Sequence, residues 1–429
     1  MNEDWVQTIW KYGWFNHDEL RTTTGIPVQV IHPGEQNFSS GPDFSRAQLA
    51  LGFQLWAGTV EIHVKSSDWN KHHHTHDPAY KNVILHVVWE HDDEITLPDG
   101  RVLPVLELQH RVDSVLLMQW ERLMASTGDF HCRNSWELVP HYVFRKVLEE
   151  QGLGRLVEKS DELERYVGKG LEALQELFWQ RVFAAAGSKH NKEVFAQLAV
   201  QLPMMELERL SLYERLVLLW GASGLLHTRK REEDLEYWCA TFERLRKRFG
   251  VTVLSPVCWR FMRVRPANYP TVRIEQLAVI LGSATELWLY VTRGAWEQFA
   301  ETMNTLLRQS ALIKSAQSSV TSLVRLILIN AVAPMMLLLG RQREQSNLQA
   351  ASVELWNTLK AEEHHYTTTW KEHGVTLKNV TESQGCIRLA REYCRLRFCG
   401  HCEIGRTILE LSNSGMEETV DAEEPGKSS

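Results

Sequence analysis

The sequence predicts an α+β protein, with a mixed β-sheet at the N-terminus followed by a large all-α region and a C-terminal cysteine cluster. Three observations lead to this fold class. Residues 1–110 contain short runs of alternating or β-branched apolar residues separated by Gly, Pro, Asn and Asp, which is typical of strands and turns. From about residue 111, apolar residues recur at spacings of three and four, which indicates amphipathic helices. Four of the seven cysteines lie within residues 386–402.

Several strands are predicted in the first 110 residues. Residues 46–51 and 60–65 alternate apolar and polar side chains, as strands with one buried face do. Residues 83–89 are almost continuously apolar, as in a strand that is buried on both faces of a sheet. Residues 27–31 form a short apolar strand, and Pro98-Asp99-Gly100 predicts the turn of a hairpin between 94–97 and 102–108.

The remainder of the chain is predicted to be helical, with no fixed repeat length that would indicate a solenoid. The most apolar run, 323–339, is interrupted by Arg325, Asn330 and Pro334, so we expect a buried helix and no membrane partner. The predicted helices span residues 116–123, 143–153, 171–186, 194–202, 207–226, 232–249, 273–281, 295–307, 319–339 and 350–359.

These patterns predict four parts: an α/β domain at 1–110, a helical domain at 111–382, a cysteine-cluster segment at 383–410 and a disordered acidic tail at 411–429. The formal net charge is −7, which excludes a protein that coats nucleic acid through bulk positive charge but allows a local basic cleft. The odd number of crowded cysteines favours a reducing compartment. Since the N-terminal residues carry no secretory pattern, we expect a cytoplasmic protein.

The sharpest chemical signal is a pair of acidic residues on neighbouring predicted strands. A strand places alternate residues on one face, so Glu61, His63 and Lys65 point the same way. Asp43 enters the preceding strand, and antiparallel pairing would bring its carboxylate beside Glu61. Two carboxylates and a backbone carbonyl suit Mg²⁺ or Mn²⁺, which activates water and stabilises charge on a phosphodiester. In the alternative interpretation, Asp43 caps a turn and Glu61 is an exposed strand residue.

A histidine-rich stretch follows the acidic strand. Its imidazoles could bind the scissile phosphate or complete the metal site. The three consecutive histidines at 72–74 cannot all face one way, so most of them are expected in solvent. We expect Asp68 and His76 to join His63 in the site, and we expect His86 to be a hydrogen-bonded core histidine because it lies within a buried strand.

The strand order and its acidic residues resemble the restriction-endonuclease-like superfamily, whose signature is Pro-Asp, a spacer, an acidic residue, one further residue and Lys (PD-(D/E)xK). The resemblance implies that Asp43 and Glu61 are metal ligands, together with the carbonyl of Ile62. His63 occupies the lysine position of the signature, and Lys65 could supply the ammonium from one step further along the same face. Candidates for the acidic residue that the first helix often contributes are Glu19 and Glu35.

The cysteine cluster is a second candidate metal site, with the spacing C-x7-C-x4-C-x2-C. A Cys-x-x-Cys loop returns two thiolates to one point, so Zn²⁺ and a [4Fe–4S] cluster are both candidate cofactors. His401 or Cys132 could replace one sulfur, and in the alternative interpretation two of the cysteines are simply apolar helix residues. Certain RecB-type nucleases, which the chain resembles in this respect, join a restriction-like core to such a cluster. The candidate ligands are Cys386, Cys394, Cys399 and Cys402.

A third unusual stretch is rich in arginine and proline. Arg263, Arg265 and Arg273 could bind the phosphates of a substrate. The alternative, which we favour, is a rigid corner in which the two prolines fix the entry to a helix and the arginines pair with carboxylates.

Taken together, the motifs resemble a bacterial family described as domain of unknown function family 2851, over almost the whole chain. This resemblance implies no activity. The matching pieces are residues 41–44, 58–63, 67–69, 76–77, 80, 83–88, 221–226, 265–278 and 383–405.

The leading functional hypothesis is a metal-dependent nuclease that hydrolyses DNA or RNA, in which Asp43 and Glu61 hold the ion and His63 or Lys65 orients the attacking water. The second hypothesis is a non-catalytic assembly factor that binds nucleic acid or protein on a degenerate nuclease fold. A third and weaker hypothesis is hydrolysis of a small substrate at the histidine-rich stretch.

Overall fold

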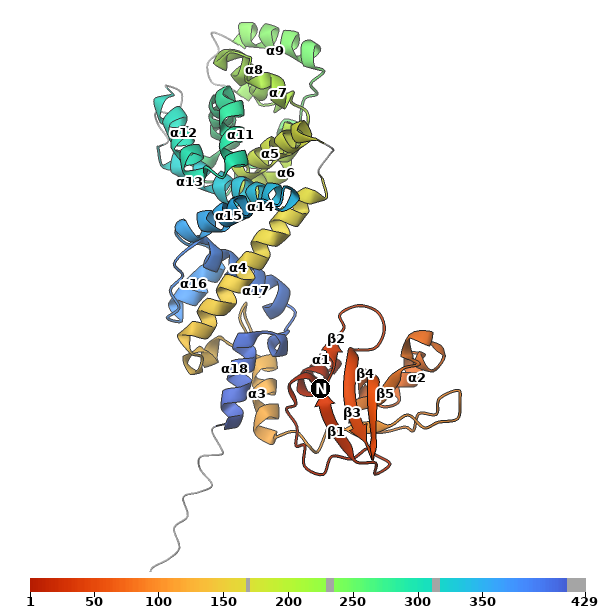
Figure 1. Ribbon diagram of the computed structural model, residues 1–429. Coiled ribbons are helices and arrows are strands. Elements are labelled where there is room, and N and C mark those ends of the chain that lie inside the picture. Colours follow the sequence, from red (N-terminus) through yellow and green to blue (C-terminus); the bar gives the residue numbers. More distant parts are fainter. Residues whose placement is uncertain (167–169, 229–234, 311–316, 415–429) are drawn as a thin grey trace, which may run out of the picture. The chain divides into compact units, whose positions relative to one another are not determined.

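The fold is described from a computed structural model of the chain, which describes residues 1–166, 170–228, 235–310 and 317–414. The chain forms two compact units (Figure 1). Unit 1 comprises Met1–Val147, Glu372–Val375 and the residues from Ile387 onward, and unit 2 comprises Leu148–Lys371 and Thr376–Cys386. Unit 1 thus joins the predicted sheet domain to most of the predicted cysteine segment. The predicted disordered tail lies outside the described residues from residue 415, and residues 411–414 end helix α18 (Glu403–Ser414).

Unit 1 contains a six-stranded mixed sheet, which confirms the sheet predicted for the N-terminal region. The strands follow the order β1-β3-β4-β5-β6, and β2 pairs with β3. Pairing is antiparallel from β1 through β3 to β4 and parallel from β4 through β5 to β6. The strands are β1 (Val28–His32), β2 (Glu35–Gln36), β3 (Phe44–Leu51), β4 (Gln54–Lys65), β5 (Val83–Glu90) and β6 (Val105–Glu107).

The burial of the strands follows their residue patterns. In β3 the apolar residues Ala47, Leu49 and Leu51 are buried, as their alternation predicts. β5 is buried from Val83 to Val88, because it has parallel neighbours on both sides and is covered on both faces. The predicted hairpin at 94–108 is reduced to a single antiparallel bridge between Thr96 and Val102, and the chain continues into β6 parallel to β5.

Helix α1 (Glu3–Tyr12) packs against β4. Its first turn is capped by Asn2, whose side chain accepts a hydrogen bond from the Trp5 amide at 3.2 Å. The buried face of the helix, which includes Trp5 and Trp10, docks it on the sheet. Consequently the polar side chains of its first two turns lie near the start of β3. The connection from β4 to β5 contains the short helix α2 (Asp68–Lys71) and two 3₁₀ turns, at His74–His76 and Pro78–Tyr80.

Further helical segments of unit 1 come from distant parts of the chain. α4 (His141–Glu164) begins in unit 1 and continues into unit 2. The other segments are α3 (Ser114–Ala125), a 3₁₀ turn at Arg133–Leu138, a π-helical turn at Ala390–Cys394, a 3₁₀ turn at Cys399–His401, and α18.

Unit 2 is mainly helical, as predicted, and one large apolar cluster forms its core. The long apolar stretch contains a π-helical turn, Leu328–Val332, directly before the helix that carries Pro334, which cannot donate a backbone hydrogen bond. The helices are α5 (Leu171–Ala186), α6 (Ser188–Val200), α7 (Met204–Leu207), α8 (Leu212–Ala222), α9 (Leu235–Phe249), α10 (Pro270–Ile280), α11 (Ala284–Arg293), α12 (Trp296–Gln309), α13 (Gln317–Ile327), α14 (Ala333–Gln342), α15 (Ser346–Thr358), α16 (His365–Glu372) and α17 (Val380–Leu389).

Two helical stretches, Pro270–Arg293 and Val320–Gln342, are long and apolar enough to cross a membrane. Their most apolar windows are 61% and 83% buried inside the protein. The core helices of soluble proteins have the same property, so the two stretches are weak indications of a membrane span. The helix predicted at 323–339 is buried, as expected.

Candidate metal centre

The structure brings Asp43 and Glu61 together. Asp43 directly precedes β3, and Phe44 of β3 pairs with Val60 of β4, so the two acidic residues are neighbours across antiparallel strands. The Asp43 amide donates to Glu61 Oε2 at 3.1 Å, and the Ile62 amide donates to Asp43 Oδ2 at 2.9 Å. Each carboxylate therefore accepts a hydrogen bond from the backbone segment that carries the other, and the two side chains lie next to each other on the sheet.

Helix α1 contributes two further polar side chains to this place. Gln7 Nε2 donates to Asp43 Oδ1 at 2.9 Å and lies 3.5 Å from Glu3 Oε1, one turn earlier on the helix. Glu3 is thus a third carboxylate of the site, and burial raises its pKa. Glu19 and Glu35, the residues predicted for this role, lie elsewhere: Glu19 is exposed and Glu35 forms an exposed ion pair with Arg46 at 3.1 Å. The signal that could have identified Glu3 is its i,i+4 spacing to Gln7 directly after a helix cap.

The acidic group is electrostatically uncompensated. Burial raises the pKa of Asp43 to about 7, against the hydrogen bond from Ile62 that lowers it, and Glu3 adds to the rise. Burial, followed by the charge of Asp43, raises the pKa of Glu61 to about 9. Among the described residues, neither Asp43 nor Glu61 lies within ion-pair distance of a Lys or Arg. A cation bound between them would supply the missing positive charge.

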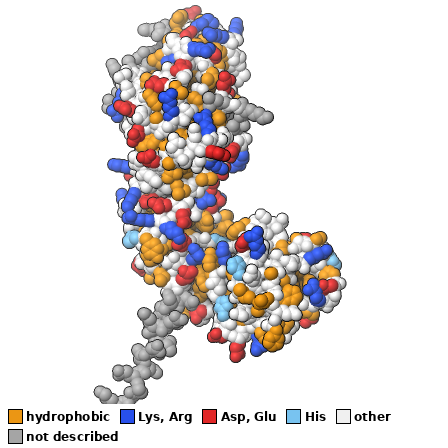
Figure 2. Space-filling view, in the orientation of Figure 1, with side chains coloured by type: hydrophobic (Ala, Val, Ile, Leu, Met, Phe, Trp, Pro, Cys, Tyr) orange, Lys and Arg blue, Asp and Glu red, His pale blue; other side chains and the backbone are white. Residues whose placement is uncertain are grey.

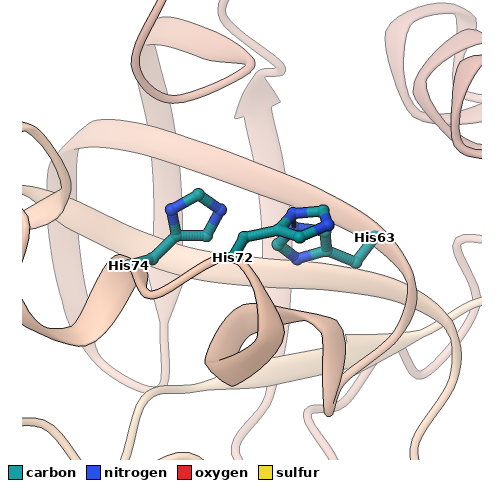
Figure 3. Close-up of side chains that lie close together, drawn as sticks. All are labelled: His63, His72 and His74. Atoms are coloured by element: carbon teal, nitrogen blue, oxygen red, sulfur yellow. Dashed lines mark hydrogen bonds between the residues drawn. The ribbon is translucent and has the colours of Figure 1, made fainter.

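Two histidines lie near the Oε1 atom of Glu61, and together with His72 they form a cluster of three imidazoles (Figure 3). His63, two residues further along β4, places its Nε2 atom 3.6 Å from Glu61 Oε1, and His74 Nε2 lies 3.3 Å from the same oxygen. His63 Nε2 lies 3.0 Å from His72 Nδ1, and His63 Nδ1 lies 2.9 Å from His86 Nε2. Among the described residues, His63, His72 and His74 are the one group of three metal-ligand side chains whose donor atoms all lie within 4.8 Å of one another.

The loop conformation selects which histidines face the site. His73 has a left-handed backbone (φ 62°) and an exposed side chain, so the chain reverses there and its two neighbours turn toward β4. His74 stacks on Tyr80 with ring centroids 3.8 Å apart. His76, which the sequence analysis favoured, is exposed. His86 is a hydrogen-bonded core histidine, as expected, and its partner is His63.

Burial keeps the central imidazoles uncharged. It lowers the pKa of His63 to about 3, and the neighbouring His72 and His74 act in the same direction. Burial also lowers the pKa of His74, and it lowers that of His86 well below its usual range, with a further contribution from His63. A neutral imidazole has one unprotonated ring nitrogen, and this is the form in which histidine binds a metal ion.

Two of the predicted site residues are engaged elsewhere. The Lys65 ammonium pairs with Glu90 at 3.1 Å and its side chain is 44% exposed, so it makes no contact with the acidic pair. The Asp68 carboxylate accepts from the Lys65 amide at 3.0 Å and from Lys71 Nζ at 2.6 Å, which fixes the turn after β4.

The predicted arginine stretch lies in unit 2. Arg263 and Arg265 are exposed, whereas Arg273 is fully buried. The Arg273 guanidinium donates to Gln276 Oε1 and to Asn268 Oδ1, each at 2.8 Å. These two contacts join Arg273 to the turn that leads into α10 and to α10 itself, which is the position that the corner interpretation gives it.

The seven cysteines, all within the described residues, are free thiols. Cys386 is buried in the unit 2 part of α17, whereas Cys394, Cys399 and Cys402 belong to unit 1. Burial, followed by the charge of Cys402, raises the pKa of Cys132 to about 12, and burial followed by the charges of Cys132 and Cys402 raises the pKa of Cys399. Cys132 is therefore a neighbour of the Cys-x-x-Cys loop.

A family model described as "Protein of unknown function (DUF2851)" matches residues 3–365. The matched span begins at Glu3 and contains both strands of the acidic pair and the histidine loop, and it ends before the cysteines at 386–402. Searches of curated proteins and of solved structures gave no match. The match covers most of the chain and includes the resembling pieces from 41–44 to 265–278, whereas the piece at 383–405 lies beyond it. The protein therefore belongs to the DUF2851 family.

Proposed function

We propose that the protein is a metal-dependent nuclease that hydrolyses phosphodiester bonds of DNA or RNA at the Asp43–Glu61 site. The observation that carries the proposal is the pair formed by the buried Glu61 and the half-buried Asp43, whose carboxylates each accept a hydrogen bond from the other's backbone segment and have no Lys or Arg partner among the described residues. Such a pair is stable as two anions only with a cation between them.

The arrangement of elements supports a restriction-endonuclease-like fold as part of this proposal. α1 precedes an antiparallel set of strands, and a short helical connection leads from the acidic strand β4 to the parallel strand β5. Asp43, directly before β3, and Glu61 on the adjacent strand β4 follow the order that the superfamily signature gives, and Glu3 comes from the preceding helix. Lys is absent from its usual position, where His63 stands instead.

The donor set fits a hard divalent cation. Asp43 and Glu61 would hold Mg²⁺ or Mn²⁺ together with the Ile62 carbonyl, and Glu3 offers a further oxygen. A bound ion of this kind activates water and neutralises charge that develops on the phosphate. Gln7 holds Asp43 in place through its 2.9 Å hydrogen bond. His63 is uncharged at neutral pH, so it can orient water by hydrogen bonding, but its low pKa makes it a weak proton acceptor.

The test is cleavage of single- and double-stranded DNA and RNA by the full chain with Mg²⁺ or Mn²⁺. Asp43→Asn and Glu61→Gln keep the shape of each side chain, and each is expected to reduce cleavage by about 100-fold or more, as the loss of one transition-state contact does. Glu35→Gln is the matched control, since Glu35 is acidic, near in sequence and exposed. Cleavage that survives in both site variants would overturn the proposal.

A second candidate function is a non-catalytic protein that binds nucleic acid or a protein partner. It is favoured by the His63 substitution and by the engagement of Lys65 with Glu90, which together leave the signature without its lysine. Figure 2 also shows Lys and Arg side chains interspersed with Asp and Glu on the displayed face. Calorimetric titration with Mn²⁺ separates the two candidates, because the non-catalytic protein would show neither Mn²⁺ affinity at Asp43 and Glu61 nor cleavage.

We also propose a structural cofactor, Zn²⁺ or a [4Fe–4S] cluster, at the cysteine loop. The Cys402 amide donates to the Cys399 carbonyl at 3.2 Å, a turn that brings the two thiols to the same side. Cys132 and Cys394 are the further candidate ligands, with Cys132 in the place that the sequence analysis gave to Cys386. Elemental analysis with an anaerobic absorbance spectrum tests this cofactor, and Cys399→Ser is expected to lose it.

A further inference from the structure

The histidine cluster has the geometry of a second metal position beside the acidic pair. We propose that His63, His72, His74 and Glu61 Oε1 hold a transition-metal ion of the Zn²⁺ class. The proposal deepens the proposed function, on which it rests through the shared Glu61 carboxylate. Its donors come from β4, from the residue that follows α2 and from the 3₁₀ turn after it, so three separate segments converge on one point (Figure 3).

Three of the distances between the donor atoms are close to those of a tetrahedral site. With metal–nitrogen bonds of about 2.0–2.1 Å, two ligands of a tetrahedral zinc ion lie about 3.3 Å apart. His63 Nε2 and His72 Nδ1 are 3.0 Å apart, His74 Nε2 and Glu61 Oε1 are 3.3 Å apart, and His63 Nε2 and Glu61 Oε1 are 3.6 Å apart. These three distances lie within a few tenths of an ångström of a tetrahedral edge. Glu61 lies outside the group of donor atoms that are all within 4.8 Å of one another, so it would have to move closer to the imidazoles to share one ion with all three.

One donor is a buried polar atom that makes no hydrogen bond. His74 Nε2 is buried, its side chain is 10% exposed, and it faces Glu61 Oε1 without a hydrogen bond. Leaving such an atom unsatisfied is unfavourable, and a metal ion would satisfy it together with the carboxylate oxygen. The stacking of His74 on Tyr80 holds the ring in this orientation.

The cluster also has an outer contact of the kind that orients metal-ligating histidines. His63 Nδ1 lies 2.9 Å from Nε2 of His86, which is fully buried on β5. A proton on His63 Nδ1, donated to His86, leaves the lone pair of His63 Nε2 directed at the cluster. Metal-binding histidines commonly use the second ring nitrogen in this way.

The donor chemistry distinguishes this position from the acidic one. Imidazole nitrogen favours Zn²⁺ and related borderline ions, whereas an oxygen-only set favours Mg²⁺ or Mn²⁺. Glu61 faces both positions, since its Oε2 accepts from the Asp43 amide and its Oε1 faces the imidazoles. His72 is exposed, so an ion can enter from solvent.

The experiment is a titration of the metal-free full chain with Zn²⁺, and with Co²⁺ as a spectroscopic probe whose visible bands report tetrahedral coordination. His72→Gln is the principal variant because His72 is exposed and its loss leaves the fold intact; His74→Gln is the second. Each is expected to weaken Zn²⁺ binding at one site by about 10-fold or more. His76→Gln is the matched control, since it removes an exposed histidine of the same loop and should leave binding unchanged.

Because the cysteine loop can also bind Zn²⁺, the readout is the difference in Zn²⁺ stoichiometry and affinity between wild type and each histidine variant. Asp43→Asn is expected to abolish Mn²⁺-dependent cleavage while it retains the histidine-dependent Zn²⁺ and Co²⁺ signal. Zn²⁺ bound through the histidines in a protein without nuclease activity would support this inference and refute the proposed function. Equal Zn²⁺ stoichiometry and affinity in wild type, His72→Gln and His74→Gln would overturn the inference, even if Mn²⁺-dependent cleavage is found.

Discussion

The Asp43 and Glu61 carboxyls compete for protons and for a cation at the same place. Glu61 is 5% exposed, and burial raises its pKa to about 9 and that of Asp43 to about 7. Without a metal ion, at least one of the two therefore carries a proton at neutral pH. A divalent cation must displace that proton before it can bind both oxygens.

Mn²⁺ affinity is therefore expected to increase with pH. Between pH 6 and 9 the pH passes the raised pKa values of Asp43 and Glu61. Below each pKa the ion must displace a proton, and every displaced proton makes the apparent affinity rise by up to about tenfold per pH unit. Calorimetric titration at several pH values measures this slope, and Glu61→Gln should reduce it. An affinity that does not change over this range would contradict the account.

At the scale of elements, the site depends on the close pairing of β4 with β5. Gly58 of β4 has no room for a side chain, because a Cβ atom there would lie 2.5 Å from Ile84 Cγ2 and 2.7 Å from the Asn82 carbonyl oxygen. The same strand carries Glu61 and His63 a few residues further on, so a displacement at Gly58 is expected to move these two side chains.

Gly58→Ala is accordingly expected to lower the free energy of unfolding by about 1–3 kcal/mol, as overpacking of a tight site does. It should also weaken Mn²⁺ binding. Urea unfolding measures the first effect and calorimetry the second. Ala57→Ser, at the adjacent exposed position, is the control and should change little. A Gly58→Ala protein as stable as wild type would show that the two strands do not pack as described.

The features of the fold and of the acidic site that could be predicted from the sequence are those produced by interactions between residues close together in the chain or on paired strands. The meeting of Asp43 and Glu61 followed from strand alternation and from one antiparallel pairing, both of which are readable over a few residues. Glu3 was missed because its position depends on how α1 docks through buried Trp5 and Trp10, which is a tertiary effect. The parallel placement of β6 was missed for the same reason, since turn residues alone predicted a hairpin.

The conformation of the histidine loop is the part of the site that could least be predicted from the sequence. Three consecutive histidines cannot all point in one direction, but the sequence alone does not show which of them faces the site. Which histidines face the site depends on the left-handed backbone at His73. Few residues other than Gly adopt this conformation, and nothing in the sequence predicts it at a histidine. The favoured His76 is exposed as a result, and His72 and His74 take its place.

At the scale of the whole molecule, unit 1 is assembled from segments far apart in the chain. His401 Nε2 lies 2.7 Å from Asp4 Oδ1, and a Cβ atom at Gly400 would lie 2.6 Å from the Thr8 side chain. The 3₁₀ turn that carries the cysteine loop thus packs on α1, the helix that provides Glu3. The protonation state of the acidic site is therefore expected to affect the folding stability of unit 1.

The sign of this effect follows from the direction of the pKa shifts. Asp43 and Glu61 have folded-state pKa values raised above their ordinary values of 3.8 and 4.5, so their contribution is fully present below pH about 4 and is lost as the pH rises toward 9. His63 does not oppose this trend above pH 7, because its pKa is lowered from 6.5 to about 3 and it is neutral in both states there.

We therefore expect metal-free protein to lose stability between pH 7 and 8.5, with Mn²⁺ restoring it. Chemical unfolding at the two pH values, with and without Mn²⁺, measures the effect. Glu61→Gln should remove most of the pH dependence, because it resembles the protonated carboxyl. Metal-free wild type that gains stability over this range relative to Glu61→Gln would be inconsistent with a buried, uncompensated acidic pair.

Anomalous X-ray scattering from crystals of the full chain grown with Mn²⁺ tests the central claim most directly. We predict a manganese peak about 2 Å from carboxylate oxygens of both Asp43 and Glu61, and no such peak in Asp43→Asn crystals. The account would be contradicted by crystals in which the Asp43 and Glu61 side chains are well ordered but no manganese lies between them, at a Mn²⁺ concentration at which the protein cleaves nucleic acid.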